Sequence, residues 1–136
     1  MRARPPWVLG PGLLAAGLAL AGCGGGESGS AEQTVRDFVK ATNERDADRV
    51  CDELVSKEFV EQATLQTGSR AGEACKQQIR SLKRATFKLE KIEEVDVKGD
   101  TARVRATLEV QKQPQTQLFR LKKQDGDWRL TGGPAG

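Results

Sequence analysis

Residues 101–110 read TARVRATLEV, and they are the most regular stretch of the chain. Small and aliphatic residues take every second position, and polar or charged residues take the positions between them. A period of two predicts a β-strand with one face buried and the other in solvent. The preceding Lys98-Gly99-Asp100 predicts a hairpin turn, so we expect an antiparallel partner just upstream.

The same alternation continues on both sides of this strand. Its apolar positions are, in chain order, Phe87, Leu89, Val95, Val97, Phe119, Leu121, Trp128 and Leu130. An irregularity near Glu93-Glu94 predicts a β-bulge, and residues 111–115, which contain Pro114, are expected to form a loop. Asp125-Gly126 is a strong hairpin signal. The sequence therefore predicts a four-stranded antiparallel meander with one apolar face.

Upstream of residue 86 the apolar positions follow a helical period instead. Three groups each share a helix face: Val35, Phe38, Val39 and Thr42; then Val50, Cys51, Leu54 and Val55; then Ala71, Ala74, Cys75, Ile79 and Leu82. Ser30 and Gln33 form a capping-box pattern ahead of the first group. The predicted fold class is α+β, with three N-terminal helices packed on one face of a curved four-stranded antiparallel sheet.

The first 23 residues have the order of an export signal. Arg2 and Arg4 precede an uncharged, Leu- and Ala-rich segment at 7–21, which is shorter than a membrane-spanning helix. The segment ends in Leu20-Ala21-Gly22-Cys23, which resembles the bacterial lipobox. The resemblance implies cleavage between Gly22 and Cys23 and attachment of a diacylglycerol, with acyl chains such as palmitate, to the Cys23 thiol. A plain secretory signal and a short membrane anchor are the alternatives.

This assignment divides the chain into four parts. Residues 1–22 are the signal peptide, residues 23–30 are the lipidated cysteine and a flexible Gly/Ser tether, residues 31–131 are the folded domain, and residues 132–136 are a disordered tail. The protein is then expected at the extracytoplasmic face of a cell membrane, where the lipid anchors it.

The expected state of the cysteines depends on the export assignment. Of the three, Cys51 and Cys75 remain if Cys23 carries lipid. Outside the cytoplasm such a pair is expected to form a disulfide, and two buried free thiols are the alternative. No metal site is expected, because the chain has no histidine and two cysteines are too few for a closed zinc site.

The composition fits one small soluble domain. The chain has 136 residues, of which 37% are hydrophobic and 30% are charged. The formal net charge is +3, and removing Arg2 and Arg4 with the signal leaves 20 basic against 19 acidic side chains. Nucleic-acid binding, which needs a clustered basic surface, is therefore not expected.

The order of elements resembles the nuclear-transport-factor-2-like superfamily. Three strings carry the resemblance: Thr34-Val35-Arg36-Asp37-Phe38, Arg45-Asp46-Ala47-Asp48-Arg49-Val50-Cys51 and Asp125-Gly126-Asp127-Trp128-Arg129-Leu130. The resemblance implies a cone of helices against a curved sheet, and lipoproteins of this kind are familiar from actinobacteria. The usual sheet of the superfamily is longer and surrounds a deep pocket, so four strands leave open whether the interior is hollow or filled.

Enzymes of this superfamily use buried Asp, Tyr, His or Arg side chains. This chain has no Tyr and no His, and the alternation places Asp96 and Glu109 on the outer face of the sheet. We therefore expect no enzyme, no catalytic residue and no cofactor. Phe119 and Trp128 point inward, where they either line a small pocket or belong to the core.

The predicted function is a non-catalytic binding or protein-interaction module. The alternative is a small-molecule carrier or an enzyme that uses the interior pocket. The expected partners are the membrane, through the lipid, and an extracytoplasmic protein, while the oligomeric state stays open. The outer sheet face is either a docking surface for anionic lipid or an acidic partner, or simply a solvated face. Its cations are Arg103, Arg105, Arg120, Lys122 and Arg129.

Overall fold

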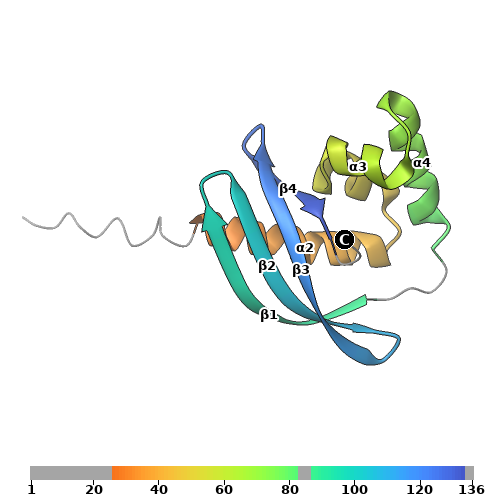
Figure 1. Cartoon of the computed structure of the whole chain (residues 1–136). Coiled ribbons are helices and arrows are strands. Elements are labelled where there is room, and N and C mark those ends of the chain that lie inside the picture. The colour runs from red at the N-terminus through yellow and green to blue at the C-terminus, as the bar shows by residue number, and fades with distance from the viewer. Residues whose placement is uncertain (1–25, 83–86, 134–136) are drawn as a thin grey trace, which may run out of the picture.

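The structure, a computed structural model, describes residues 26–82 and 87–133. Its sheet has four strands: β1 (Phe87–Lys98), β2 (Thr101–Val110), β3 (Gln113–Gln124) and β4 (Asp127–Gly132). Neighbouring strands are antiparallel and follow the order β1-β2-β3-β4, and Figure 1 shows that the sheet curves. The predicted α+β class, with helices ahead of a curved antiparallel meander, is confirmed.

The β1–β2 hairpin contains a local cause of this curvature. Register shifts occur between Leu89 and Lys91 and between Ile92 and Glu94, and the second shift confirms the bulge predicted near Glu93-Glu94. An extra residue in one strand bends that strand and increases its twist. The buried face of β2 is the predicted one, with Ala102, Val104, Ala106 and Leu108 inside the core.

Four helical segments precede the sheet in the described part of the chain: α2 (Gly26–Asn43), the π-helix η2 (Arg49–Leu54), α3 (Lys57–Thr64) and α4 (Gly68–Arg80). In Figure 1, α2 lies across the sheet, and α3 and α4 sit together at one end. A single face of α2 places Ala31, Val35 and Val39 in the core that the helices share with the strands. None of the described helices is long and apolar enough to cross a membrane.

The second predicted helix is in fact two segments, η2 and α3. Val55 between them is extended and pairs in parallel with Leu130 of β4. Ser56 then begins α3, because its Oγ accepts a hydrogen bond from the Phe59 N–H at 3.1 Å, and serine is a preferred N-cap residue. The predicted count of three helices is therefore corrected to four helical segments.

The first helix begins earlier than predicted. Residues 26–30, which were assigned to the flexible tether, already belong to α2. Glu27 lies in the first turn, where a negative charge is favourable, and its Oε1 is 2.7 Å from Lys123 Nζ. This contact ties the first helical turn to the sheet.

The loop predicted at 111–115 is wrong. A two-residue turn, Gln111-Lys112, connects β2 to β3, and β3 starts at Gln113. Pro114 fits this strand because, within residues 26–82 and 87–133, β4 pairs with β3 only from Arg120 onward. The side of Pro114 that faces away from β2 therefore needs no ladder hydrogen bond.

The two ends of the chain lie partly outside the described residues. Residues 1–25, which include the predicted signal peptide and Gly22 and Cys23, lie outside the described residues, as do residues 134–136. β4 ends at Gly132, so the folded domain extends one residue into the predicted tail.

Candidate functional site

An apolar pocket lies between α2 and the inner face of the sheet. Its volume is about 340 Å³, near the lower end of the range for small-molecule sites. The lining residues are Phe38, Val39, Thr42, Leu82, Phe87, Leu108 and Phe119. Residues from α2, from the segment after α4 and from three strands therefore meet at one hollow.

Helix α2 supplies one wall of the apolar pocket. Phe38 and Thr42 are four residues apart, so they lie one above the other on the same helix face. The Phe38 ring meets the Phe119 ring edge to face, with centroids 6.3 Å apart and planes at 67°. This arrangement is favourable for aromatic pairs, and it fixes the helix wall relative to β3.

Asn43 holds the start of β1 against the end of α2. Its Nδ2 donates to the Phe87 carbonyl oxygen at 2.7 Å, and its Oδ1 accepts from the Phe87 N–H at 2.8 Å. Backbone groups this close to a core need partners, and one side chain satisfies both of them here. The pair of bonds fixes Phe87 at the pocket.

Thr42 brings a polar atom to this apolar lining. The residue is buried, and its Oγ1 has no hydrogen-bond partner among the described residues. Threonine in a helix commonly donates to the carbonyl four residues earlier, as Thr34 does to Ser30 and Thr64 does to Val60. A buried hydroxyl without a partner is costly. The Thr42 oxygen is not exposed in the pocket, whose accessible lining is apolar, so a ligand would reach it only after the Thr42 side chain rotates.

Phe119 and Trp128, the two candidate pocket residues from the sequence, do not share a pocket. Phe119 lines the apolar pocket, whereas Trp128 borders a separate polar hollow of about 340 Å³. Other residues of that hollow include Ser30, Thr34, Asp37, Arg49, Glu53 and Asp127. Trp128 Nε1 is buried without a partner among the described residues, and Lys123 Nζ lies 5.5 Å from the ring centroid.

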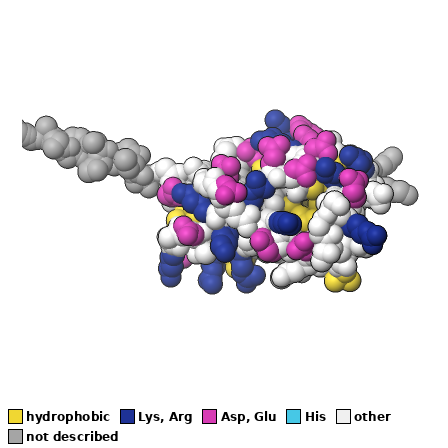
Figure 2. Space-filling model, turned by 90° about the horizontal axis from the view of Figure 1, so that it is seen from above, with side chains coloured by type: hydrophobic (Ala, Val, Ile, Leu, Met, Phe, Trp, Pro, Cys, Tyr) yellow, Lys and Arg dark blue, Asp and Glu magenta, His cyan; other side chains and the backbone are white. Residues whose placement is uncertain are grey.

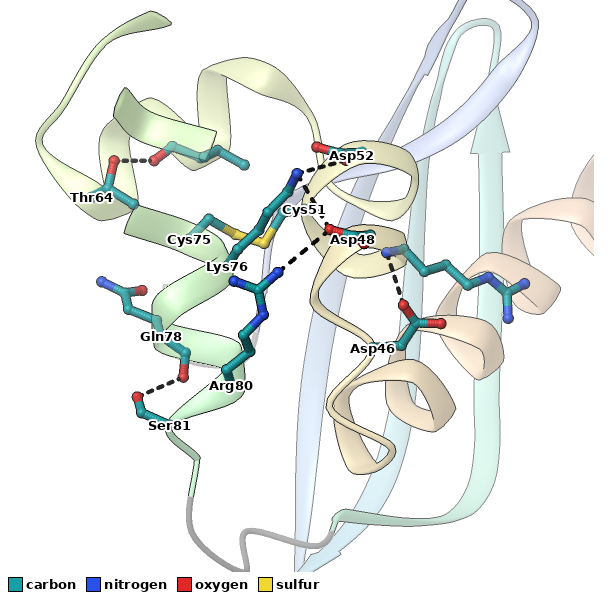
Figure 3. Close-up of a disulfide and its surroundings, with 12 residues drawn as sticks. Asp46, Asp48, Cys51, Asp52, Thr64, Cys75, Lys76, Gln78, Arg80 and Ser81 are labelled. Carbon is teal, nitrogen blue, oxygen red and sulfur yellow. Dashed lines mark hydrogen bonds and ion pairs between the residues drawn. A yellow bond between two sulfur atoms is a disulfide. The ribbon is translucent and has the colours of Figure 1, made fainter. Parts of the chain in front are cut away.

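The predicted pairing of Cys51 with Cys75 is present as a disulfide that joins η2 to α4, with Cα atoms 6.1 Å apart. Figure 3 shows ion pairs beside it. Lys76 Nζ lies 3.0 Å from Asp52 Oδ2 and 3.3 Å from Asp48 Oδ1. Hydrogen bonds to Asp52 and Asp48 raise the pKa of Lys76 above its ordinary value.

These contacts have a structural role. Cys51 also borders a hollow of about 400 Å³ near α3 and α4, whose charged lining residues are Asp52, Lys57, Glu73, Lys76 and Arg129. The charges are of mixed sign, and Lys76 is already paired with Asp52. We therefore interpret the disulfide and its neighbouring ion pairs as contacts that hold α4 against η2.

The two acidic residues considered for catalysis lie away from the apolar pocket. Asp96 is exposed opposite Arg103, and Glu109 is half-buried opposite Lys88 and Pro114. Over the described ranges, no group of three or more His, Cys, Asp or Glu residues is placed to hold a metal ion.

Sequence reasoning missed most of the pocket lining. Phe38 and Thr42 were recognised as members of an apolar helix face, and Phe87 as a strand residue, without a link between them. One signal was present, because Thr42 is a polar residue in an otherwise apolar stripe. Nothing in the spacing indicated that Leu82, after α4, would reach the same hollow.

Comparisons with known proteins agree with the fold. A family model described as "Putative lumazine-binding" matches residues 27–131, and no curated protein matches the sequence. The chain is similar to an NTF2-like protein of unknown function from Pseudomonas putida KT2440, with 14% identity over 79% of this chain and 84% of that one, and a TM-score of 0.50. This similarity shows that the chain shares the fold of that protein.

Two designed proteins are also similar. The de novo designed NTF2 fold protein NT-9 has 18% identity over 72% of this chain and 78% of its own, with a TM-score of 0.44. A de novo designed protein with a curved β-sheet has 17% identity over 46% of this chain, with a TM-score of 0.38. The matched part spans 60% of that second design.

Proposed function

The chain belongs to the family described as "Putative lumazine-binding", and from this premise we propose that its domain is a binding module for a small, mainly apolar molecule. The apolar pocket of about 340 Å³, with one unpartnered hydroxyl at Thr42, is the observation that carries the proposal. Small-molecule sites are typically apolar hollows with a few placed polar groups that orient the ligand.

The lining favours a ligand less polar than a lumazine. A lumazine is a bicyclic pteridine with two carbonyl groups and several ring nitrogens. Each polar group buried without a partner costs about 1–3 kcal/mol, and Thr42 is the polar side chain that this lining offers. A flat or aliphatic molecule with few polar groups fits this apolar lining better.

The same lining supports a non-catalytic role. General acid–base catalysis needs a titratable group within hydrogen-bond reach of the reacting atoms. The residues around the apolar pocket are six hydrophobic side chains and one threonine. We therefore propose binding without turnover.

We further propose that Cys23 carries a diacylglycerol that holds the domain at the extracytoplasmic face of a cell membrane. The order of Arg2 and Arg4, an uncharged segment, and small residues before Cys23 supports this. The disulfide between Cys51 and Cys75 also fits an oxidising compartment.

Binding can be tested with residues 23–136 carrying Cys23→Ser, produced in an oxidising compartment. The probes are the uncharged fluorophore N-phenyl-1-naphthylamine and lumazine. Val39→Phe places a larger side chain in the pocket, so we expect it to weaken binding of the apolar probe at least tenfold. Because enlarging a buried side chain can cost about 1–3 kcal/mol, the thermal midpoint of the variant is measured alongside binding to show that it is folded. Val97→Phe, on half-buried Val97 of β1, is the matched control and should bind normally.

The outcomes separate the parts of the proposal. Saturable binding of the apolar probe that Val39→Phe abolishes would support it. If only lumazine bound, and Val39→Phe abolished that binding, the pocket would still be the binding site. The proposal that its ligand is mainly apolar would then be overturned. Binding of neither probe would overturn the binding function.

The anchor has its own test. The intact mass of protein from the membrane fraction should equal residues 23–136 plus a diacylglycerol, and no thiol should react until the protein is reduced. An unprocessed chain with three reactive thiols would overturn the anchor.

A further inference from the structure

We propose that one end of the outer sheet face docks on the anionic lipid headgroups of the membrane that carries the chain. This inference rests on the proposed lipid anchor at Cys23. It concerns four cations that we call the basic end patch: Lys98, Arg103, Arg120 and Lys122.

Strand register brings the basic end patch together. Lys98 pairs with Thr101, which pairs in turn with Lys122, while Arg103 lies opposite Arg120 one row further along. Because side chains alternate between the faces of a sheet, all four cations share the outer face. All four are exposed, and in Figure 2 Lys and Arg side chains line the lower left edge of the molecule.

Two other cations of the outer face already have partners. Arg105 Nη1 lies 3.4 Å from Glu94 Oε2, and Arg129 Nη1 donates to the Asp52 carbonyl oxygen at 2.7 Å. By contrast, no residue of the basic end patch forms an ion pair within the described ranges. The patch therefore offers four cations to an external anion.

The arrangement of the patch is unfavourable in the absence of an anion. Arg103 and Arg120 face each other directly across β2 and β3, and like charges in that position destabilise the pairing. The acids beside the patch are Asp96, Asp100 and Glu58, whose charge interacts with that of Lys122. Four cations against three carboxylates leave a net charge of +1. Lipid phosphates would relieve the repulsion, and guanidinium groups bind phosphate through two parallel hydrogen bonds.

The start of α2 and the patch lie at the same end of the sheet, on its inner and outer faces respectively. Glu27 Oε1 contacts Lys123 Nζ at 2.7 Å. Lys123 follows Lys122 of the patch in β3 but points to the inner face, since it pairs with the buried Trp128. Cys23 precedes Gly26 by three residues, which span at most about 11 Å when fully extended. A domain anchored through this short tether would therefore turn that end of the sheet, with the patch, toward the headgroups.

Proximity also favours lipid over an acidic protein as the partner. A surface linked to the chain by a short tether is present at a high effective concentration. Basic residues near an anionic membrane each add to its attraction, and the effect fades within the screening distance. A separate protein would have to displace this surface.

The experiment uses residues 23–136, in which Cys23 is the only thiol outside the disulfide. The Cys23 thiol is coupled to a maleimide lipid in vesicles of phosphatidylcholine, with or without phosphatidylglycerol. Lysines are then acylated with an uncharged reagent and quantified by mass spectrometry. We expect Lys98 and Lys122 to react several-fold more slowly on the anionic vesicles. Exposed Lys40 of α2 and Lys112 of the β2–β3 turn are internal references and should not change.

Raised salt, or the double variant Arg103→Gln with Arg120→Gln, should remove the protection of Lys98 and Lys122. Equal labelling on both kinds of vesicle would overturn the proposal, and so would equal slowing of all four lysines. Protection in native membranes but not on pure lipid would instead assign the patch to an acidic protein. In this experiment chemical coupling replaces biosynthetic lipidation, so its result does not depend on whether the cell lipidates Cys23. The anchor proposal is tested separately by the intact mass of the native protein, and the two failures can be told apart.

Discussion

At the scale of single residues, Thr42 is the sharpest test of the pocket. Its buried hydroxyl has no partner among the described residues, and valine has nearly the same shape without the polar atom. We therefore expect Thr42→Val to raise the free energy of unfolding of the unliganded protein by about 1 kcal/mol. Urea denaturation followed by circular dichroism measures the change.

Thr64→Val is the matched control, because it makes the same substitution at a bonded hydroxyl. Thr64 Oγ1 donates to the Val60 carbonyl oxygen at 2.8 Å, so its loss should lower the free energy of unfolding by about 1 kcal/mol. If both variants were destabilised equally, Thr42 would have a partner, and it could not serve as the free polar group of the pocket.

Single residues also mark the limit of sequence reasoning about the site. The stripe of α2 correctly put Phe38, Val39 and Thr42 on one buried face. The inward direction of Phe119 and Trp128 was also correct, since both are buried. That they line two separate hollows could not be predicted, because it depends on which part of the inner face α2 covers. Strand alternation alone does not contain that information.

At the scale of elements, the β2–β3 turn can be improved. Gln111 and Lys112 both have positive φ, 53° and 69°, a conformation that costs about 1–2 kcal/mol for residues other than glycine. Asn-Gly is the preferred pair for such turns. We expect Gln111→Asn with Lys112→Gly to raise the midpoint of thermal unfolding and the free energy of unfolding by about 1 kcal/mol.

The reverse change at the next hairpin serves as the control. Gly126 has φ +87°, so Gly126→Ala should lower the free energy of unfolding by about 1 kcal/mol. If Gly126→Ala stabilised the protein, positive φ would not be costly at that turn. If the Asn-Gly pair gave no stabilisation, the same would hold for the β2–β3 turn. Either result would contradict this prediction.

The residue types of the two turns explain why the β3–β4 hairpin was predicted and the β2–β3 hairpin was missed. Asp125-Gly126 carries a turn signal in its residue types, whereas Gln111-Lys112 carries none. Pro114 then suggested a loop, because proline is excluded from central strands. The sequence does not reveal that this part of β3 pairs on only one side in the described structure, and that pairing decides the question.

The disulfide is a second element-scale test, since it fastens η2 to α4. The cysteines are 24 residues apart, and a closed loop of that length stabilises by about 3 kcal/mol in the chain-entropy account. We expect the double variant Cys51→Ala with Cys75→Ala to lose about that much in denaturant titrations, and reductant to have no further effect on it.

The ion pairs next to the disulfide should contribute less. Lys76 contacts Asp48 and Asp52, whose side chains are 72% and 53% exposed. Exposed ion pairs contribute about 0–1 kcal/mol, so Lys76→Gln should have a small effect. A loss from Lys76→Gln as large as that from the cysteine pair would mean that the charges, not the covalent bond, hold α4 in place.

At the scale of the whole molecule, the order of patterns was enough to predict the fold. Period-2 strands after period-3.6 helices allow few arrangements other than helices on one face of a meander. The cavity could not be predicted in this way, because a pocket is the small difference between the space inside the sheet and the volume that side chains fill. Here it depends on how Phe87, Leu108 and Phe119 pack against the wall that α2 forms.

The whole molecule also has a characteristic dependence of stability on pH. The chain has no histidine, so no side chain with an ordinary pKa between about 5 and 8 changes charge on unfolding. We therefore expect the thermal midpoint to be nearly constant between about pH 6 and 9. A shift of several degrees inside that range, measured by circular dichroism, would contradict this expectation.

Outside that range two groups set the direction of the change. Hydrogen bonds from the backbone and from Gln124 lower the pKa of Glu58 below 4.5, so its contribution is present above that pH and is lost as pH falls through the lowered value. The pKa of Lys76 is raised above 10.5 by Asp52 and Asp48, so its contribution is present below that pH and is lost as pH rises through the raised value. Glu58→Gln should reduce only the loss of stability at acid pH. Lys76→Gln should reduce only the loss of stability at alkaline pH. If either variant changed both limbs equally, the pH dependence would belong to the net charge of the molecule and not to these two contacts.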